Sequence, residues 1–142
     1  MKNYRLAFLG FGNVGKALAR LLLTKRIEIE EQYDLAFSVT GIATGRHGTA
    51  IDPQGIDLEK ALALLEEGQS GSLSPLSTQP LPTNSVDFIR RCSADVLFEN
   101  TPVSYVDGQP AVSYIEQALT QGMHVVTANK GPVVHGYRSL TD

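Results

Sequence analysis

A glycine-rich turn begins at residue 10, between an apolar segment and an amphipathic one. It reads Gly10-Phe11-Gly12-Asn13-Val14-Gly15 and directly follows Leu6-Ala7-Phe8-Leu9. A G-x-G-x-x-G turn that leaves a strand and opens a helix is typical of units that bind a dinucleotide. Gly10 permits the tight turn, Gly12 lets a pyrophosphate approach the backbone, and Gly15 lets the helix pack closely on the strand. All six residues of the turn are therefore candidate cofactor-binding residues.

The segment after the turn predicts a helix whose N-terminus offers free N–H groups and a positive dipole end to phosphates. Apolar residues recur along it at helical spacing, which predicts one buried face. That face comprises Val14, Ala17, Leu18, Leu21 and Leu22. Lys16 and Arg20 fall between these positions and are expected to face solvent. A charged connection is expected over residues 25–34.

Strand and helix patterns alternate along the rest of the chain. They predict an α/β fold of the Rossmann type, with a doubly wound, mostly parallel sheet and helices on both faces. A second strand is expected at 35–43, followed by a glycine-punctuated loop that runs on through Pro53 and Gly55. Asp57 is expected to cap a helix that buries Leu58, Ala61, Leu62 and Leu65 and stops at Gly68.

The second half of the chain continues the alternation after a loop over 69–82 that is rich in Ser, Gly and Pro. A helix that opens at Pro110 and ends at Gly122 is expected to turn Ala111, Ile115, Ala118 and Leu119 inward. The other expected elements are a helix at 85–91, strands at 94–99 and 123–127, and a helix at 134–140.

Composition bounds the class of protein. The 142 residues suit one domain, assigned to 1–142, and the net charge of -3 without a basic stripe argues against a nucleic-acid partner. No apolar run approaches the roughly 20 residues that span a bilayer. The single cysteine, Cys92, excludes an internal disulfide framework and fits a reducing, cytoplasmic location, with a structural role for the thiol. The three histidines show no metal-ligand spacing, so no metal site is expected.

The end of the second strand bears on the choice of cofactor. Sites that prefer NAD commonly place an acidic residue there, bound to the ribose 2′-OH. This strand instead ends in Ala43-Thr44-Gly45-Arg46, and Asp34 lies before the strand, at the wrong end. Arg46 could bind a 2′-phosphate through its planar fork of donors, which favours NADP over NAD. His47 and Lys60 are weaker candidates, and a solvated loop arginine is the alternative.

Polar residues also follow the two later strands. Asn100 and Thr101 could hydrogen-bond the nicotinamide ribose or carboxamide. Lys130 could hold a carboxylate or polarise a carbonyl oxygen near the nicotinamide. Because parallel strands bring their carboxyl ends to one edge of the sheet, these residues are expected beside the glycine turn.

Together these motifs resemble the homoserine dehydrogenase family. The resemblance rests on the turn at 9–15 and on Glu99-Asn100-Thr101-Pro102. It continues through Gly108-Gln109-Pro110-Ala111, Tyr114-Ile115, Ala118-Leu119 and Gly122, and ends with the stretch His124-Val125-Val126-Thr127-Ala128-Asn129-Lys130-Gly131-Pro132. The last stretch is the most specific. The resemblance covers essentially the whole chain and is weakest between Gly45 and Pro82.

The resemblance implies an oxidoreductase that interconverts L-homoserine and L-aspartate 4-semialdehyde with NAD(P), a step of threonine and methionine biosynthesis. It implies that Gly12, Asn13 and Val14 lie at the pyrophosphate, with Thr101 and Lys130 near nicotinamide and substrate. It also matches Arg46 to a residue at the 2′-phosphate. The family's substrate domain, with its acidic residues and main catalytic lysine, is absent from this chain. We therefore expect cofactor binding without completed catalysis, an assisting role for Lys130, and a homo-oligomeric full-length enzyme.

Two other readings remain open. One is a different nicotinamide reductase of amino-acid synthesis, of the aspartate-semialdehyde or dihydrodipicolinate type. The former should supply a cysteine nucleophile, and the latter should lack the Ala128-Asn129-Lys130 run. The other reading is a non-catalytic NAD(P)-binding module with a regulatory or redox-sensing role, which would need an exposed apolar surface for its partner.

Overall fold

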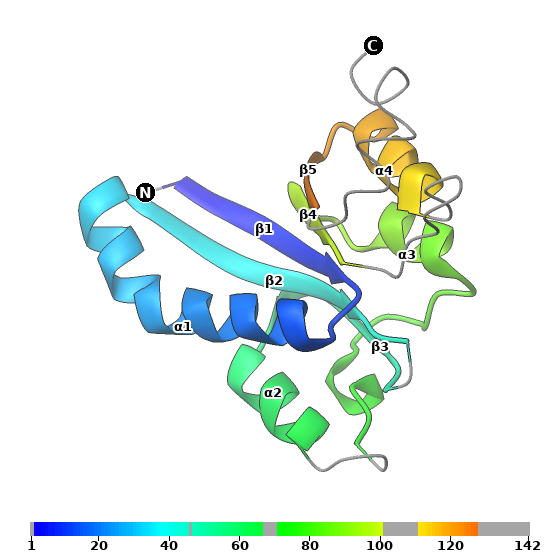
Figure 1. The fold of residues 1–142 in the computed structure, drawn as a ribbon, viewed down its shortest axis with the longest axis horizontal. Helices are drawn as coiled ribbons and strands as arrows, with labels where there is room; N and C mark the ends of the chain where they lie inside the picture. The colour runs from blue at the N-terminus through cyan, green and yellow to red at the C-terminus, as the bar shows by residue number, and fades with distance from the viewer. Residues whose placement is uncertain (1, 46, 67–70, 101–110, 128–142) are drawn as a thin grey trace.

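The computed structural model describes residues 2–45, 47–66, 71–100 and 111–127. A five-stranded sheet with the order β3-β2-β1-β4-β5 organises them (Figure 1). The strands are β1 (Lys2–Leu9), β2 (Leu35–Ala43), β3 (Thr49–Ile56), β4 (Val96–Glu99) and β5 (His124–Thr127). The helices are α1 (Asn13–Tyr33), α2 (Leu58–Glu66), the short 3-10 helix η2 (Ser74–Leu76), α3 (Ser85–Arg91) and α4 (Ala111–Thr120).

The sheet is parallel except at one edge. Strand β1 lies in the middle, parallel to β2 and β4, and β5 continues parallel to β4. Strand β3 runs antiparallel to β2. The predicted α/β fold with a mostly parallel sheet is confirmed, and the carboxyl ends of β1, β2, β4 and β5 meet at one edge.

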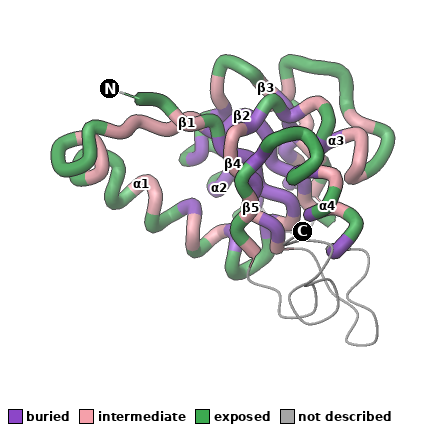
Figure 2. The backbone as a smooth tube through the Cα atoms, turned by 90° about the horizontal axis from the view of Figure 1, so that it is seen from above, coloured by how far each residue is buried: buried purple, intermediate pink, exposed green. Residues whose placement is uncertain are grey.

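Helices cover both faces of the sheet because successive side chains of a strand point to opposite sides. Leu6 and Phe8 of β1 lie in one apolar cluster with residues of α1 and α2. Ala7 and Leu9 lie in the other, with residues of α3 and α4. Figure 2 shows the buried backbone gathered around the strands between these two layers.

The predicted buried face of α1 was wrong for Val14, Ala17 and Leu21, whereas Leu18 and Leu22 pack against the core as predicted. Val14 and Leu21 are 55% and 53% exposed, and Ala17 is exposed as well. The buried stripe is centred on Gly15 and Ala19 instead, with Leu18, Leu22 and Leu23 packed beside it. It lies about 100° around the helix from Val14 and Leu21, since each residue advances the helix by that angle. Small residues at the centre let α1 lie close to the sheet.

The charged connection predicted over 25–34 was also wrong, because α1 continues to Tyr33. Charged residues suit the exposed face of a helix, where Lys25 and Glu28 form an ion pair of 3.1 Å between Nζ and Oε2. The helix ends where Asp34 takes a left-handed conformation with φ 53°. No glycine or proline interrupts residues 16–40.

Strand β3 occupies residues predicted as a loop. Its first residues pair regularly with β2 and bury Ala50 and Ile51. Pro53 and Gly55 fall in its irregular middle, where a register shift interrupts the pairing. Proline and glycine are tolerated on an edge strand, because no second neighbour needs their backbone groups.

Most other elements agree with the sequence predictions. Strand β2 has the predicted bounds, and the backbone N–H of Lys60 donates to Oδ1 of Asp57, 3.2 Å away, as expected of a helix cap. The four apolar residues predicted for α2 are all buried. Helix α3 has the predicted bounds, whereas β4 and β5 begin at Val96 and His124, later than predicted.

Helix α4 buries Ile115 and Ala118 as predicted, but Leu119 is 39% exposed and the prediction for it was wrong. The turn after α4 contains Gly122 with φ 86°, which fits the predicted glycine stop. The helix predicted at 134–140, Gly68 and Pro110 lie outside the described residues.

Candidate cofactor site

The three glycines of the turn have different structural roles. Gly10 has φ 91°, a conformation that favours glycine. A Cβ on Gly15 would lie 3.0 Å from the carbonyl oxygen of Gly10 and 3.2 Å from Cδ1 of Phe11, so α1 would be pushed off the sheet. A Cβ on Gly12 would meet nothing within 4 Å. The space in front of Gly12 is thus open, as the approach of a pyrophosphate requires.

The N-terminus of α1 is suited to an anion. Gly12 is its N-cap residue, no side chain caps it, and no acidic residue lies in its first turn. Gly12, Asn13 and Val14 are all exposed. A helix N-terminus carries about half a positive charge on N–H groups that lack partners within the helix. The residues present therefore fit the diphosphate of a dinucleotide.

The ring of Phe11 takes no part in this opening. It is 4% exposed and packs edge-on against Phe8, with ring centroids 5.2 Å apart. Only the backbone of Phe11 can therefore contribute to the ligand-facing side of the turn. Its side chain instead anchors the turn to the core below α1.

Two backbone hydrogen bonds hold the ends of three strands around the turn. The N–H of Gly10 donates to the carbonyl oxygen of Ala43, at the end of β2, over 2.9 Å. The N–H of Asn100, just past β4, donates to the carbonyl oxygen of Leu9 over 2.8 Å. The predicted meeting of Gly10 and Asn100 at one edge of the sheet is confirmed.

The side chain of Asn100 adds an unusual feature. Its Nδ2 is buried and is the one such side-chain nitrogen or oxygen, among the residues described, without a hydrogen-bond partner. This atom lies 3.7 Å from the position a Cβ on Gly15 would take, so it sits against the first turn of α1. An unpartnered buried amide costs about 1–3 kcal/mol. A polar ligand atom at this place would remove that cost.

The loop between β2 and β3 closes tightly. The hydroxyl of Thr44 donates to the carbonyl oxygen of Gly48 over 2.8 Å and accepts the backbone N–H of His47 over 2.6 Å. The ring nitrogen Nδ1 of His47 lies 2.9 Å from the carbonyl oxygen of Gly71. This contact holds the imidazole ring of His47 against the backbone at Gly71. Arg46, the predicted ligand of a 2′-phosphate, lies outside the described residues.

The two other charged residues weighed for the ribose 2′-position, Asp34 and Lys60, lie away from the glycine turn. Asp34 precedes β2, and its carbonyl oxygen accepts the N–H of Lys2 at the amino end of β1. Lys60 belongs to α2, which follows β3. Because β3 runs antiparallel and its last residue, Ile56, pairs with Val39 in the middle of β2, α2 begins away from the glycine turn, and Lys60 is not placed to bind there.

The ends of β4 and β5 carry a pair that the sequence analysis did not single out. The hydroxyl of Thr127 donates a hydrogen bond of 2.6 Å to Oε2 of Glu99, whose side chain is fully buried. The two residues are direct neighbours in the pairing of β4 with β5. An acidic residue at the end of an apolar strand is the signal that could have drawn attention to Glu99. Thr101 and Lys130 lie outside the described residues.

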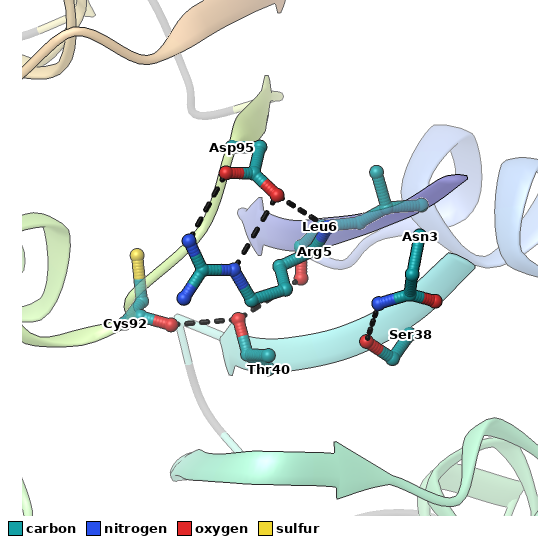
Figure 3. A network of polar contacts seen from close by, with 7 residues as sticks. All are labelled: Asn3, Arg5, Leu6, Ser38, Thr40, Cys92 and Asp95. Carbon is teal, nitrogen blue, oxygen red and sulfur yellow. Dashed lines mark hydrogen bonds and ion pairs between the residues drawn. The ribbon is translucent and has the colours of Figure 1, made fainter. Parts of the chain in front are cut away.

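Cys92 is a structural residue, as predicted. It is completely buried, and burial raises the pKa of its thiol to about 11. Its carbonyl oxygen accepts the hydroxyl of Thr40 over 2.6 Å (Figure 3). A thiol that stays protonated at neutral pH is a poor nucleophile, which disfavours the aspartate-semialdehyde type of reductase.

No helix in the described ranges has the length and apolar character needed to cross a membrane. Among those same residues, no group of three or more histidine, cysteine, aspartate or glutamate side chains could hold a metal ion.

Comparison with known proteins points to one family. The family model described as the NAD binding domain of homoserine dehydrogenase matches residues 10–142. The chain is 35% identical over 137 residues to the homoserine dehydrogenase of Methanocaldococcus jannaschii, covering 96% of this chain and 40% of that protein. It is 32% identical over 137 residues to the NAD(+)-dependent homoserine dehydrogenase of Pseudomonas canavaninivorans, covering 96% of this chain and 38% of that protein.

The fold has solved counterparts as well. The homoserine dehydrogenase of Thermoplasma acidophilum matches with a TM-score of 0.77 at 26% identity, covering 99% of this chain and 40% of that chain. This chain therefore spans about two fifths of the length of the relatives that it matches.

Proposed function

This chain belongs to the homoserine dehydrogenase family through its NAD-binding domain, and on that premise we propose that it holds NADP or NAD at the Gly10–Gly15 turn for oxidation and reduction of a small amino acid. The substrate pair is L-homoserine and L-aspartate 4-semialdehyde. The observation that carries the proposal is the open space at Gly12 in front of an uncapped helix N-terminus.

Each part of the chain has a distinct task in this proposal. The N–H groups at Gly12, Asn13 and Val14 bind the diphosphate, aided by the dipole of α1. Asn100 and Thr101 orient the nicotinamide ribose or carboxamide. Lys130 stabilises negative charge on the substrate oxygen and assists the reaction.

The bound cofactor supplies hydride transfer, while the protein supplies position and charge. We assign the residues that take the hydroxyl proton to the part of the relatives that this chain does not match. The residues that bind the amino-acid end of homoserine are assigned to the same part. The isolated chain accordingly binds cofactor and turns over little or no homoserine. The full-length enzyme is proposed to be a cytoplasmic homo-oligomer.

NADP is the preferred cofactor in this proposal. Of the described residues in the loop after β2, namely Thr44, Gly45, His47 and Gly48, none is acidic, so none of them offers a carboxylate to a ribose 2′-OH. Arg46 supplies positive charge for a 2′-phosphate instead. Since one relative is described as NAD(+)-dependent, both cofactors belong in the test.

The test is a fluorescence titration of the chain with NADPH and with NADH, followed by an assay for homoserine-dependent reduction of NADP. We expect binding of both cofactors, tighter for NADPH, and no turnover at ordinary enzyme rates. Absence of binding for both would overturn the proposal. Rapid turnover by the isolated chain would overturn the assignment of catalysis to other parts of the family's fold.

A regulatory or redox-sensing module is the second candidate. It would need a continuous apolar surface, and α1 does expose Leu21, Ile27 and Tyr33. These positions are six residues apart, so successive ones point about 120° away from one another around the helix. Leu21 and Tyr33 nevertheless line one hollow together with Leu22 and Ile29, so the enzyme-domain proposal is the stronger one because of the family match and not for lack of an apolar surface.

A further inference from the structure

The carboxyl group of Glu99 is an ionisable group in an otherwise apolar layer. Its side chain is fully buried, and it lies in a sheet position whose neighbours along the same rung in β1 and β2 are Leu9 and Ala43. Burying a carboxyl group costs free energy unless hydrogen bonds compensate it. Leu9 and Ala43 show that the sheet accepts apolar side chains in this row, whereas the other direct neighbour of Glu99, Thr127 of β5, is polar and hydrogen-bonded to it.

The position of Glu99 in the sheet gives a reason for the presence of a carboxyl group there. A single rung of paired residues crosses all five strands at their site-facing edge. Its members, in order across the sheet, are Thr49, Ala43, Leu9, Glu99 and Thr127. The glycine turn leaves directly after Leu9, and Asn100 and Thr101 follow directly after Glu99. Lys130 is three residues beyond Thr127, hence within about 11 Å of it along the chain.

The contacts along this rung are of two kinds. From β2 across β1 to β4, backbone hydrogen bonds join the strand ends, from Gly10 to Ala43 and from Asn100 to Leu9. Between β4 and β5, the side-chain hydrogen bond from Thr127 to Glu99 adds a link beyond the ladder. This hydrogen bond joins β4 and β5, the two strands that precede the residues proposed to face the nicotinamide. The proposed diphosphate site lies elsewhere, at the turn after β1.

We propose that Glu99 and Thr127 form a positioning pair that sets the spacing between the two segments that hold the nicotinamide end of the cofactor. The inference rests on the proposed function and adds to it two residues that do not themselves touch the reacting atoms. The hydrogen bond fixes the end of β4, which Asn100 and Thr101 follow in the sequence, relative to the end of β5, which precedes Lys130 in the sequence. The adenosine and diphosphate parts of the cofactor do not depend on it.

The test compares ligands that differ only in the nicotinamide. The dissociation constants of NADH and ADP-ribose form one pair, and those of NADPH and 2′-phospho-ADP-ribose form the other, all measured by calorimetry on the full chain. Thr127→Val keeps the branched shape of the side chain and removes the hydroxyl, whereas Thr127→Ser keeps the hydroxyl. Glu99→Gln keeps the shape and an acceptor oxygen but removes the charge.

Thr127→Val is expected to weaken NADH and NADPH about tenfold, a loss of about 1.4 kcal/mol, and to leave both ADP-ribose ligands within about twofold. Thr127→Ser should restore nicotinamide-dependent binding. Val126→Ala, at an exposed neighbour on β5, is the matched control and should change neither pair. Glu99→Gln should fall between wild type and Thr127→Val. Thermal melts establish that each variant is folded.

Equal weakening of both members of a pair would mean that the hydrogen bond is merely structural, and no effect on either would mean that it has no role. Both results overturn the inference while leaving the cofactor site standing. Failure of the unmodified chain to bind any of the four ligands would instead overturn the proposed function itself, and the inference with it.

Discussion

Arg5, in the middle of β1, and Asp95, just before β4, are joined through both side chain and backbone. The guanidinium Nη2 of Arg5 lies 3.1 Å from Oδ1 of Asp95, and the backbone N–H of Arg5 donates to Oδ2 over 2.8 Å (Figure 3). In return the N–H of Asp95 donates to the carbonyl oxygen of Arg5 over 2.7 Å. The pair holds the two strands together where their pairing begins, at the end of that pairing away from the candidate site. It therefore offers a test of stability that is independent of cofactor binding.

Asp95→Asn should destabilise the fold at neutral pH and much less in acid. The hydrogen bonds and the charge of Arg5 lower the pKa of Asp95 in the folded chain. Because the folded pKa is lowered, the stabilisation is present above the unfolded value of about 3.9 and is lost as pH falls through the folded pKa. The two side chains are 48% and 36% exposed, so solvent screening limits the effect to about 1 kcal/mol or less.

Urea denaturation of wild type and Asp95→Asn at pH 7 and pH 3 measures this difference. The gap between the two proteins should shrink at the lower pH, and cofactor binding at pH 7 should be the same for both. A gap of the same size at both pH values would contradict the assigned role of the carboxylate.

Gly12→Ala should impair cofactor binding far more than it impairs folding. The new Cβ meets no protein atom, and alanine in place of glycine at a helix N-cap costs about 1 kcal/mol or less. The same methyl group would occupy the space proposed for the diphosphate and should weaken NADPH and NADH about tenfold or more. Parallel NADPH titrations and thermal melts check the two effects separately.

Ala17→Val is the matched control for this change, since it adds bulk at an exposed position one turn further along α1. It should leave the affinity for both cofactors unchanged. If Gly12→Ala binds NADPH as well as wild type does, the diphosphate does not lie at this turn.

Arg46→Ala should remove discrimination between the two cofactors. A charged hydrogen bond to a phosphate contributes about 1.5–3 kcal/mol, so NADPH binding should weaken by about tenfold to a hundredfold. NADH lacks the 2′-phosphate and should bind within about twofold of wild type. Arg90→Ala, at an exposed arginine of α3, should affect neither. Weakening of NADH to the same extent would place Arg46 at a part that the cofactors share.

The thiol of Cys92 should resist modification in the folded chain. Its pKa, raised by burial from 9.0 to about 11, leaves very little thiolate at pH 8. A disulfide reagent should therefore label Cys92 at pH 8 only after denaturant is added. Since the folded pKa is the higher one, this thiol's contribution to stability is complete below pH 9 and declines as pH rises to about 11. Rapid labelling of the native protein would contradict the buried placement.

The parts of the fold that could be predicted are those with strong local signals. The glycine turn, strand β2 and the apolar face of α2 each combine a periodic pattern with a cap or a breaker. Prediction failed where charge was taken to mean a connection and where Pro53 was taken to mean a loop. In the first case the charged residues belong to the exposed part of α1, where Lys25 and Glu28 form an ion pair, and in the second an edge position tolerates proline.

The candidate site divides in the same way. The turn at 10–15 and the approach of Asn100 followed from spacing and from the geometry of parallel strands. The pairing of Glu99 with Thr127 could not be predicted, because the two residues are 28 positions apart and are brought together only by the register of β4 with β5. No local pattern marks either residue as belonging to the other.

The antiparallel direction of β3 has a consequence for how such a protein can diverge. The segment 44–48 joins two strands that pair directly, with Ala43 opposite Thr49, and no helix is suspended from it at that edge. A substitution at Gly45, where an added Cβ would meet nothing within 4 Å, would leave the packing of α1 and α2 on the sheet undisturbed, whereas His47 and Gly48 are held against the segment 71–74. A lineage could exchange one nicotinamide cofactor for the other by drift in this short loop alone, while the turn that binds what the two cofactors share stays under selection of its own.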